Sequence, residues 1–529
     1  MPSRLWDQKS DIRDNPDQIH SIPRQDSASF GRYNPYNTDY SLYRQDGSDL
    51  SIRQGETRML RHGILVFSAI ALVGSVSFGQ SPTVEANRQK ADEAYQARQY
   101  MRTVEFADAV LAEAPEDHVA LYLRGSARIE LGVSTGNPDA VRLGIADARE
   151  AIRHEGTGLP DYYLPYIFGM SYLTGMEGKV NHAQTARQVA DSVLEREDLA
   201  DEERANLLYQ RANAEVQLKN YPAAEADLRQ AIQLSPKHAA AYMLQADITA
   251  STKTPAEGLA AYSQVITVFP QDAVAYNNRG MFLLNNNQAQ QALSDFTVAA
   301  QLDPKFTEAH VNRGFCLIAN GDYATAEQAL NQALLIDEKH TGALGLRGNC
   351  RLNLGRTAEG IMDYRQVVQL APTSATPYTE LGFAQFFAGD YAGANGSFAK
   401  AMEIDSSARF LLPWRLAAEV RSGSITQELY RETLTREENK RDWVDSLILY
   451  QGGRIDEAGL LAAIHPTDPQ AREAQICEGY YFMGLEMTRR NRPAEARGYF
   501  ERALQRTTQA RLSAFRGAQL ALKTASAAN

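Results

Sequence analysis

Small and large residues recur along the chain with a fixed period of 34 residues between positions 205 and 408. Six regular units begin at Ala205, Ala239, Ala273, Thr307, Thr341 and Ala375. Position 8 of each unit is small: Ala212, Ala246, Gly280, Gly314, Gly348 and Gly382. Position 24 is large and apolar: Leu228, Tyr262, Phe296, Leu330, Tyr364 and Phe398. This pattern predicts two short antiparallel helices in each unit.

The residue types at these positions suit two helices that pack closely together. Small residues at positions 8 and 20 let the two backbones approach, and the large residue at position 24 fills the space beside them. Proline at position 32, present in four of the units, ends the second helix. A 34-residue period with these residues resembles the tetratricopeptide repeat (TPR) family. The resemblance implies an all-α fold, a right-handed solenoid of helix-turn-helix repeats whose concave groove is lined by the first helix of each repeat.

The repeat pattern continues on both sides of the regular array, with interruptions. Residues 84–204 fit degenerate TPR units, and we expect extra residues in the turns at 133–139 and 174–180. Residues 409–476 predict divergent helical pairs, and residues 477–526 predict a final TPR unit with a capping helix. A cap is needed because the last repeat would otherwise expose its stacking face.

The C-terminal part carries a second resemblance. The sequence WVDSL from Trp443, followed by CEGYYFMGLEM from Cys477, is similar to the C-terminal part of the NlpI-like family of bacterial envelope TPR lipoproteins. The resemblance implies an adaptor that gathers cell-wall hydrolases and proteases. The chain departs from that family in its longer array and in lacking the lipid-attachment cysteine, so the family's specific partners do not carry over.

The first 80 residues have a different composition. Residues 1–62 are polar, with nine basic and nine acidic side chains, and predict a disordered extension. Residues 63–80 are uncharged and predict a cleaved signal peptide, read from a start at Met59, or a retained membrane anchor. A buried apolar helix is the third alternative. Both leading interpretations place the repeats outside the cytoplasm, in the periplasm or cell envelope or anchored to the cytoplasmic membrane.

Charge and motif content narrow the function. The net charge of −11 disfavours nucleic acid, which requires a basic surface. The three cysteines, Cys316, Cys350 and Cys477, predict core residues, not disulfides or metal ligands. The nine histidines are scattered singly, and we expect no metal and no cofactor. The sequence has no phosphate-binding loop, zinc-protease motif or serine-hydrolase elbow, so we do not expect an enzyme.

Arginine recurs at position 7 of the repeat and aspartate at position 23. Four units carry both residues, and we expect them to form partly buried structural ion pairs. The pairs are Arg124–Asp147, Arg211–Asp227, Arg279–Asp295 and Arg347–Asp363. A row of ligand-binding arginines is the alternative interpretation.

Asparagine and phenylalanine collect on the first helices, where the groove is expected. An amide both donates and accepts hydrogen bonds, so a row of asparagines can hold an extended peptide backbone, with phenylalanines as apolar pockets beside it. A solvated polar face is the alternative. The candidate groove residues are Asn213, Asn277, Asn278, Asn285, Asn312, Phe315, Asn349, Asn353, Phe383 and Phe386.

The sequence therefore predicts a non-enzymatic TPR scaffold that binds protein or peptide partners in its groove and acts outside the cytoplasm. An unrecognised periplasmic enzyme or enzyme accessory subunit is one alternative, and a structural envelope component is another. Nucleic acid is not an expected partner, and a single membrane anchor is compatible with the pattern.

Overall fold

The computed structural model describes residues 81–527, apart from residues 157, 424–434, 438–440, 467 and 507–512. The expected polar extension, the apolar segment at 63–80 and residues 424–434 of the region expected to form divergent helical pairs lie outside the described residues. Every regular element in the described part of the chain is helical, which confirms the all-α prediction. The helices form two compact units, one ending at Asp295 and the other beginning at Phe296.

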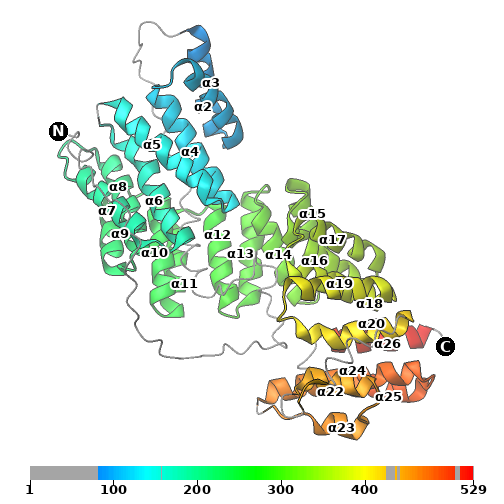
Figure 1. Ribbon diagram of the computed structural model, residues 1–529. Coiled ribbons are helices and arrows are strands. Elements are labelled where there is room, and N and C mark those ends of the chain that lie inside the picture. The colour runs from blue at the N-terminus through cyan, green and yellow to red at the C-terminus, as the bar shows by residue number, and fades with distance from the viewer. Residues whose placement is uncertain are drawn as a thin grey trace, which may run out of the picture. The chain divides into compact units, whose positions relative to one another are not determined.

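The first unit is a succession of helices, each packed against the next (Figure 1). Its helices are α2 (Pro82–Gln96), α3 (Tyr100–Glu113), α4 (His118–Thr135), α5 (Pro138–Glu155), the 3₁₀ helix η3 (Pro160–Tyr162), α6 (Tyr163–Glu177), α7 (Val180–Leu194), α8 (Asp201–Gln217), α9 (Tyr221–Leu234), α10 (Ala239–Thr252), α11 (Pro255–Val268) and α12 (Ala273–Asn285). Helix α13 (Ala289–Leu302) contains the boundary between the units. Within this unit the first helices also contact one another in sequence, α2 with α4, α4 with α6 and α6 with α8.

The second unit continues the same arrangement of helix pairs (Figure 1). Its helices are α14 (Thr307–Ala319), α15 (Tyr323–Ile336), α16 (Thr341–Asn353), α17 (Thr357–Leu370), α18 (Ala375–Phe387), α19 (Tyr391–Ile404), η4 (Arg409–Leu411), α20 (Leu412–Ser422), α22 (Trp443–Gln451), α23 (Glu457–Ala462), α24 (Pro469–Arg489), α25 (Pro493–Leu504) and α26 (Ser513–Ala527). Helix α26 packs against α24 and α25, where the sequence predicts a cap.

Close packing between positions 8 and 24 holds each helix pair together. Phe398 has no solvent-exposed surface, and its ring lies against Gly382. A methyl group added at Gly382 would come within 2.5 Å of that ring, nearer than real carbon atoms approach. A methyl group added at Gly314 would likewise come within 2.8 Å of the Leu330 side chain. The small residue at position 8 is therefore required by the size of its partner.

In the regular units other than the one beginning at Ala239, the first helix is followed by a left-handed residue at position 15 of the repeat. Glycine supplies it in three units, as Gly321, Gly355 and Gly389, with φ near +80°. Lys219 and Arg98 take the same conformation at φ +59° and +57°, where a side chain costs about 1 kcal/mol. Asn287 and Asn491 adopt it too, at φ +60° and +57°, so the same tight turn is built from different residues.

The prediction of long turns in the first unit is wrong. Helix α4 continues to Thr135 and α5 begins at Pro138, so the additional residues lengthen both helices to 18 residues. Helix α6 likewise runs to Glu177, leaving a turn of two residues before α7. Left-handed Gly136 and Gly178 end these helices, and helical hydrogen bonds are satisfied more fully than those of an open loop.

Aromatic side chains form the core of the C-terminal part. Trp414 of α20 is almost fully buried, and its ring stacks on Tyr481 of α24 at a centroid distance of 5.1 Å. Phe482 meets the same indole at 5.2 Å, edge to face. Buried aromatic pairs add about 0.5–1.5 kcal/mol each beyond their area, so this cluster stabilises the divergent region in place of the repeat pattern.

Candidate interaction surface and the arginine network

The position 7 arginines and position 23 aspartates meet in pairs on facing helices. In each pair the guanidinium donates two hydrogen bonds to one carboxylate, with N–O distances between 2.6 and 3.1 Å. All four aspartates are buried. The hydrogen bond that Arg279 donates to Asp295 raises the pKa of Arg279, and burial of the guanidinium opposes that effect. The pairs are Arg124–Asp147, Arg211–Asp227, Arg279–Asp295 and Arg347–Asp363.

A third donor of each of these arginines reaches the second helix of the preceding pair. Arg347 Nη1 donates to Asn331 Oδ1 at 2.9 Å, and Arg279 Nη1 donates to Ser263 Oγ at 3.3 Å. Arg124 reaches Asp108 and Arg211 reaches Asp191 in the same way, at 2.7 and 2.8 Å. One guanidinium therefore joins three helices from two repeats. Sequence reasoning missed this contact, although a polar residue at position 25, sixteen residues before the arginine, marks three of the four cases.

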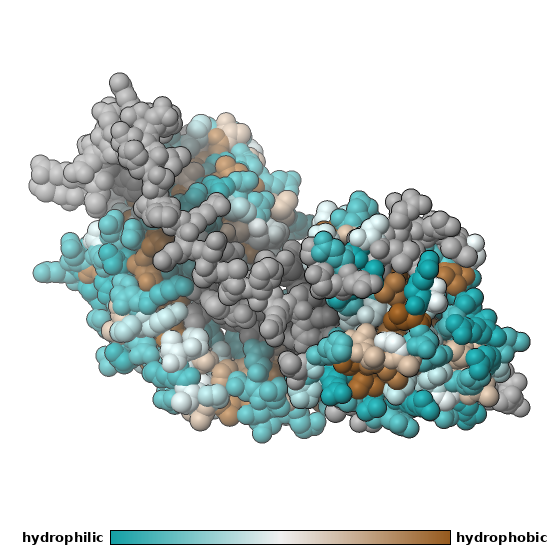
Figure 2. All heavy atoms as spheres, turned by 60° about the horizontal axis from the view of Figure 1, so that its bottom comes forward, coloured by the Kyte–Doolittle hydropathy of each residue, from teal (hydrophilic) through white to brown (hydrophobic). Residues whose placement is uncertain are grey.

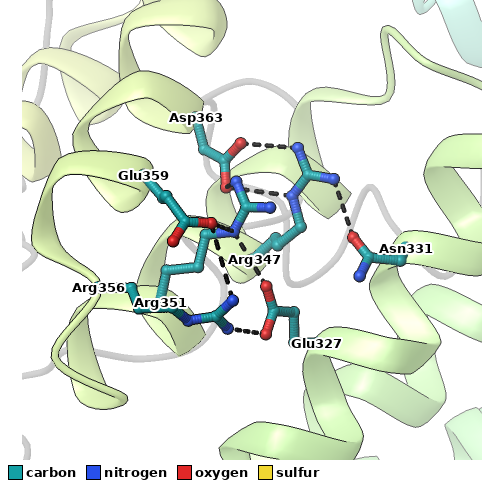
Figure 3. Close-up of polar contacts among 7 residues, drawn as sticks. All are labelled: Glu327, Asn331, Arg347, Arg351, Arg356, Glu359 and Asp363. Atoms are coloured by element: carbon teal, nitrogen blue, oxygen red, sulfur yellow. Dashed lines mark hydrogen bonds and ion pairs between the residues drawn. The ribbon is translucent and has the colours of Figure 1, made fainter.

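The network is most extensive on helices α15, α16 and α17 (Figure 3). Arg351 donates to Asp363 at 2.9 Å and to Glu327 at 3.0 Å. Arg356, at the turn after α16, also binds Glu327, and Glu359 lies 3.6 Å from Arg351. The carboxylates and cations thus satisfy one another within the repeats. Arg347 and Arg351 therefore bind side chains of the repeats themselves, which fits structural ion pairs better than a row of ligand-binding arginines.

Three of the asparagines assigned to the groove are buried and cannot hold a peptide on an open surface. Asn213 donates to the Tyr209 carbonyl at 3.1 Å within its own helix. Asn278 donates to Met243 Sδ at 3.2 Å, and Asn277 is buried beside it. Helices α8 and α12 bury these side chains, and the period alone did not reveal this burial.

The remaining candidates divide between core and surface. Phe386 is buried, and Phe383 is half-buried with its ring 5.0 Å from that of Trp414, so neither forms an open pocket. Asn285 and Asn353 are exposed. The half-buried candidates are Asn312, Phe315 and Asn349.

Asn349 and Asn353 of α16 form the most accessible part of the predicted site. The Asn353 amide donates to the Asn349 carbonyl at 2.8 Å and to its side-chain oxygen at 3.0 Å. Both residues lie one turn apart on the first helix of a repeat, where an extended segment could exchange these local hydrogen bonds for its own. The face drawn in Figure 2 is mostly hydrophilic, with hydrophobic residues in separate patches.

A half-buried carboxylate in the C-terminal part, Glu478, was also missed. Trp443 Nε1 donates to Glu478 Oε2 at 2.7 Å. Burial raises the pKa of Glu478 to about 7, and the hydrogen bonds from Trp443 and Trp414 only partly oppose it. The indole N–H group anchors the start of α22 on α24.

Other chemistry has limited support in the structure. All three cysteines are buried, and burial raises the pKa of each thiol to about 12. Within the described ranges, His, Cys, Asp and Glu side chains do not gather in any group of three that could hold a metal ion. None of the described helices is both long enough and apolar enough to cross a bilayer.

Antiparallel helix pairs, stacked in sequence and locked by arginines between repeats, define a helical-repeat protein. Four models of the tetratricopeptide repeat family match a central stretch of the chain. They match residues 209–273, 261–294, 283–350 and 341–374. No curated protein sequence matches the chain. The matched models end at residue 374, so the NlpI-like resemblance of the C-terminal part stays a prediction.

Several solved structures share parts of the fold. Pseudomonas aeruginosa PilF is 17% identical, covering 39% of this chain and 95% of its own, with a TM-score of 0.35. PilW, described as a type IV pilus biogenesis factor, is 20% identical over 44% of this chain and 98% of its own, with a TM-score of 0.32. YrrB, described as a TPR protein with an unusual peptide-binding site, is 17% identical over 36% and 96%, with a TM-score of 0.30. Similarity at this level says nothing about the partners of this chain.

Proposed function

We propose that this chain is a non-enzymatic scaffold that binds protein or peptide segments on the face formed by the first helices of its repeats. The observation that carries the proposal is the uninterrupted series of tetratricopeptide helix pairs, matched over residues 209–374. Stacked repeats present an extended surface whose shape is fixed by contacts between neighbours. The arginine bridges support this role because they hold successive pairs in one geometry.

Asn349 and Asn353 provide the test of this face. Peptides selected on the full chain from a random library would be measured against an Asn349→Ala/Asn353→Ala variant. A matched variant, Gln328→Ala/Gln332→Ala, removes two exposed amides from the second helix α15 instead. We expect the α16 variant to bind selected peptides about tenfold more weakly, because each lost hydrogen bond contributes about 0.5–1.5 kcal/mol. Equal affinity of the two variants for every selected peptide would refute binding on this face.

We further propose that the repeats act outside the cytoplasm, in a bacterial-type envelope. The support is the uncharged segment at 63–80 with arginines just before it, together with the NlpI-like resemblance near the C-terminus. N-terminal sequencing of the native protein tests the cleaved form. A mature chain beginning near Gln80 supports a signal peptide, whereas a chain that retains residues 51–61 favours an anchor. Recovery of the protein in the cytoplasmic fraction alone would contradict both forms.

A further inference from the structure

The first helices at the start of the array bring a carboxylate together with several tyrosines. Glu130 lies near the end of α4, and its charge acts on Tyr100 at the start of α3. Burial, and after it the charge of Glu130, raises the pKa of Tyr100 to about 12. The same carboxylate contributes to the raised pKa values of buried Tyr95 on α2 and Tyr209 on α8, in both of which burial is the largest cause. The charge of Glu130 therefore acts on side chains from α2, α3 and α8.

The Glu130 carboxylate makes no hydrogen bond and no ion pair with any described residue. Its Oε1 atom has no solvent-accessible surface and no hydrogen-bond partner, while the residue as a whole keeps some exposed surface. Burial raises the pKa of Glu130 to about 7, and Arg98 lowers it only partly. Taking a carboxylate from water without a donor costs several kcal/mol. No hydrogen bond to Oε1 offsets this cost in the folded protein.

Further acidic groups extend from this carboxylate along the same first helices. Asp161, in η3, lies close enough to Glu202 and Glu203 at the start of α8 that both raise its pKa, after burial, to about 6. Asp161 and Asp92 also act on Tyr122 of α4, whose ring stands against that of Tyr162 at 4.8 Å. These acidic groups, when ionised, favour a positively charged ligand.

The chain's own cations nearby are few or already occupied. Arg204 donates to the carbonyl oxygens of Leu194 and Arg196, and Arg88 is paired with Asp117 and Glu85. Arg98 remains near Glu130 in the turn before α3, without an ion pair to it. None of these cations forms an ion pair with Glu130, which leaves the carboxylate available to a cation from another molecule.

We propose that Glu130, beside half-buried Tyr100, receives a lysine side chain from the partner segment bound by the repeats. An ammonium group is attracted both by the carboxylate and by tyrosine ring faces. Because Oε1 is closed off by protein atoms, the carboxylate can be approached from one side only. That geometry suits the compact ammonium of lysine, whereas arginine gains most from binding two oxygens at once. This inference rests on the proposed peptide-binding function and names a charge that the ligand must carry.

The test compares two variants with the same change in charge. Glu130→Gln removes the enclosed carboxylate, and Glu105→Gln removes an exposed one on α3. The probe is a fluorescent, acetylated octapeptide of alternating glycine and lysine, with arginine and glutamate versions beside it, measured by anisotropy with the full chain. We expect the wild type and the Glu105→Gln variant to bind the lysine peptide alike, and the Glu130→Gln variant to bind at least about tenfold more weakly.

Three results would overturn the inference: equal binding by the two variants, no binding by the wild type, or binding of the arginine peptide as tight as that of the lysine peptide. Thermal unfolding of the Glu130→Gln variant provides the fold check, and we expect no loss, since a carboxylate without a donor is removed. The amide variant on α16 lies in the second unit. If it weakens binding of selected peptides while Glu130→Gln does not weaken lysine-peptide binding, the lysine site fails and the scaffold function stands.

Discussion

The ion pair between Arg279 and Asp295 gives a sharp prediction about stability. Asp295 is buried and accepts two hydrogen bonds of 2.8 Å from Arg279. Asp295→Leu leaves the guanidinium with Ser263 as its remaining hydrogen-bonding contact, at 3.3 Å. Hydrogen bonds to charged groups contribute about 1.5–3 kcal/mol each. The Arg279 side chain is 23% exposed, so water recovers part of the loss. We expect a net cost of about 3 kcal/mol.

The double variant should be less damaged than either single variant. Arg279→Leu/Asp295→Leu replaces both charges by apolar groups and leaves no buried ion without a partner. Replacing a whole buried pair is often close to neutral, and we expect a cost of about 1 kcal/mol.

Hydrogen exchange measured by mass spectrometry is the suitable assay, because repeat arrays can open locally without unfolding as a whole. Peptides from α12 should exchange about 100-fold faster in the single variants, since about 1.4 kcal/mol corresponds to a factor of ten. The double variant should stay within about tenfold of the wild type. Equal acceleration in single and double variants would refute the buried-charge reasoning.

Three further predictions concern other parts of the chain. Gly382→Ala should destabilise by about 1–3 kcal/mol in urea unfolding, whereas Gly396→Ala, which meets no atom within 4 Å, should stabilise by about 0.5–1 kcal/mol; the same sign for both would contradict the packing argument. Glu478 binds its proton more tightly when folded, because its pKa rises from 4.5 to about 7, so its contribution to stability is full below pH 4.5 and is lost as the pH rises through 7. Glu478→Gln should therefore match the wild type in urea unfolding at pH 4 and exceed it by up to about 3 kcal/mol at pH 8; a constant difference would refute this. A thiol reagent should label the three buried cysteines only after unfolding, and rapid labelling of the native protein would contradict their burial.

The fold followed from the sequence because side-chain size repeats with the helix pairs. The contact between Gly382 and Phe398 is local to one repeat, and the position of each residue in the period was sufficient to predict it. The hydrogen bond from Arg347 to Asn331 was missed because it depends on how one repeat is rotated against the next. Asn213 was placed on the wrong surface for a similar reason, since a small rotation of its helix moves a side chain from groove to core.

Glu130 could not be found from the sequence at all. A glutamate near the end of a helix usually lies in water, and its neighbours here come from helices α2, α3 and α8, far apart along the chain. Only the arrangement of those helices in space shows that the carboxylate is enclosed and has no donor.

The sixteen-residue reach of the bridging arginines constrains how such an array can change in length. Inserting or deleting a few residues between Ser263 and Arg279 would separate donor from acceptor and leave the joint unbonded. Loss or duplication of a complete 34-residue repeat instead preserves the spacing, and the guanidinium meets the equivalent residue of a new neighbour. Evolution can therefore lengthen or shorten the array by whole repeats, because the hydrogen bond from the arginine to the preceding repeat can form again at each new junction.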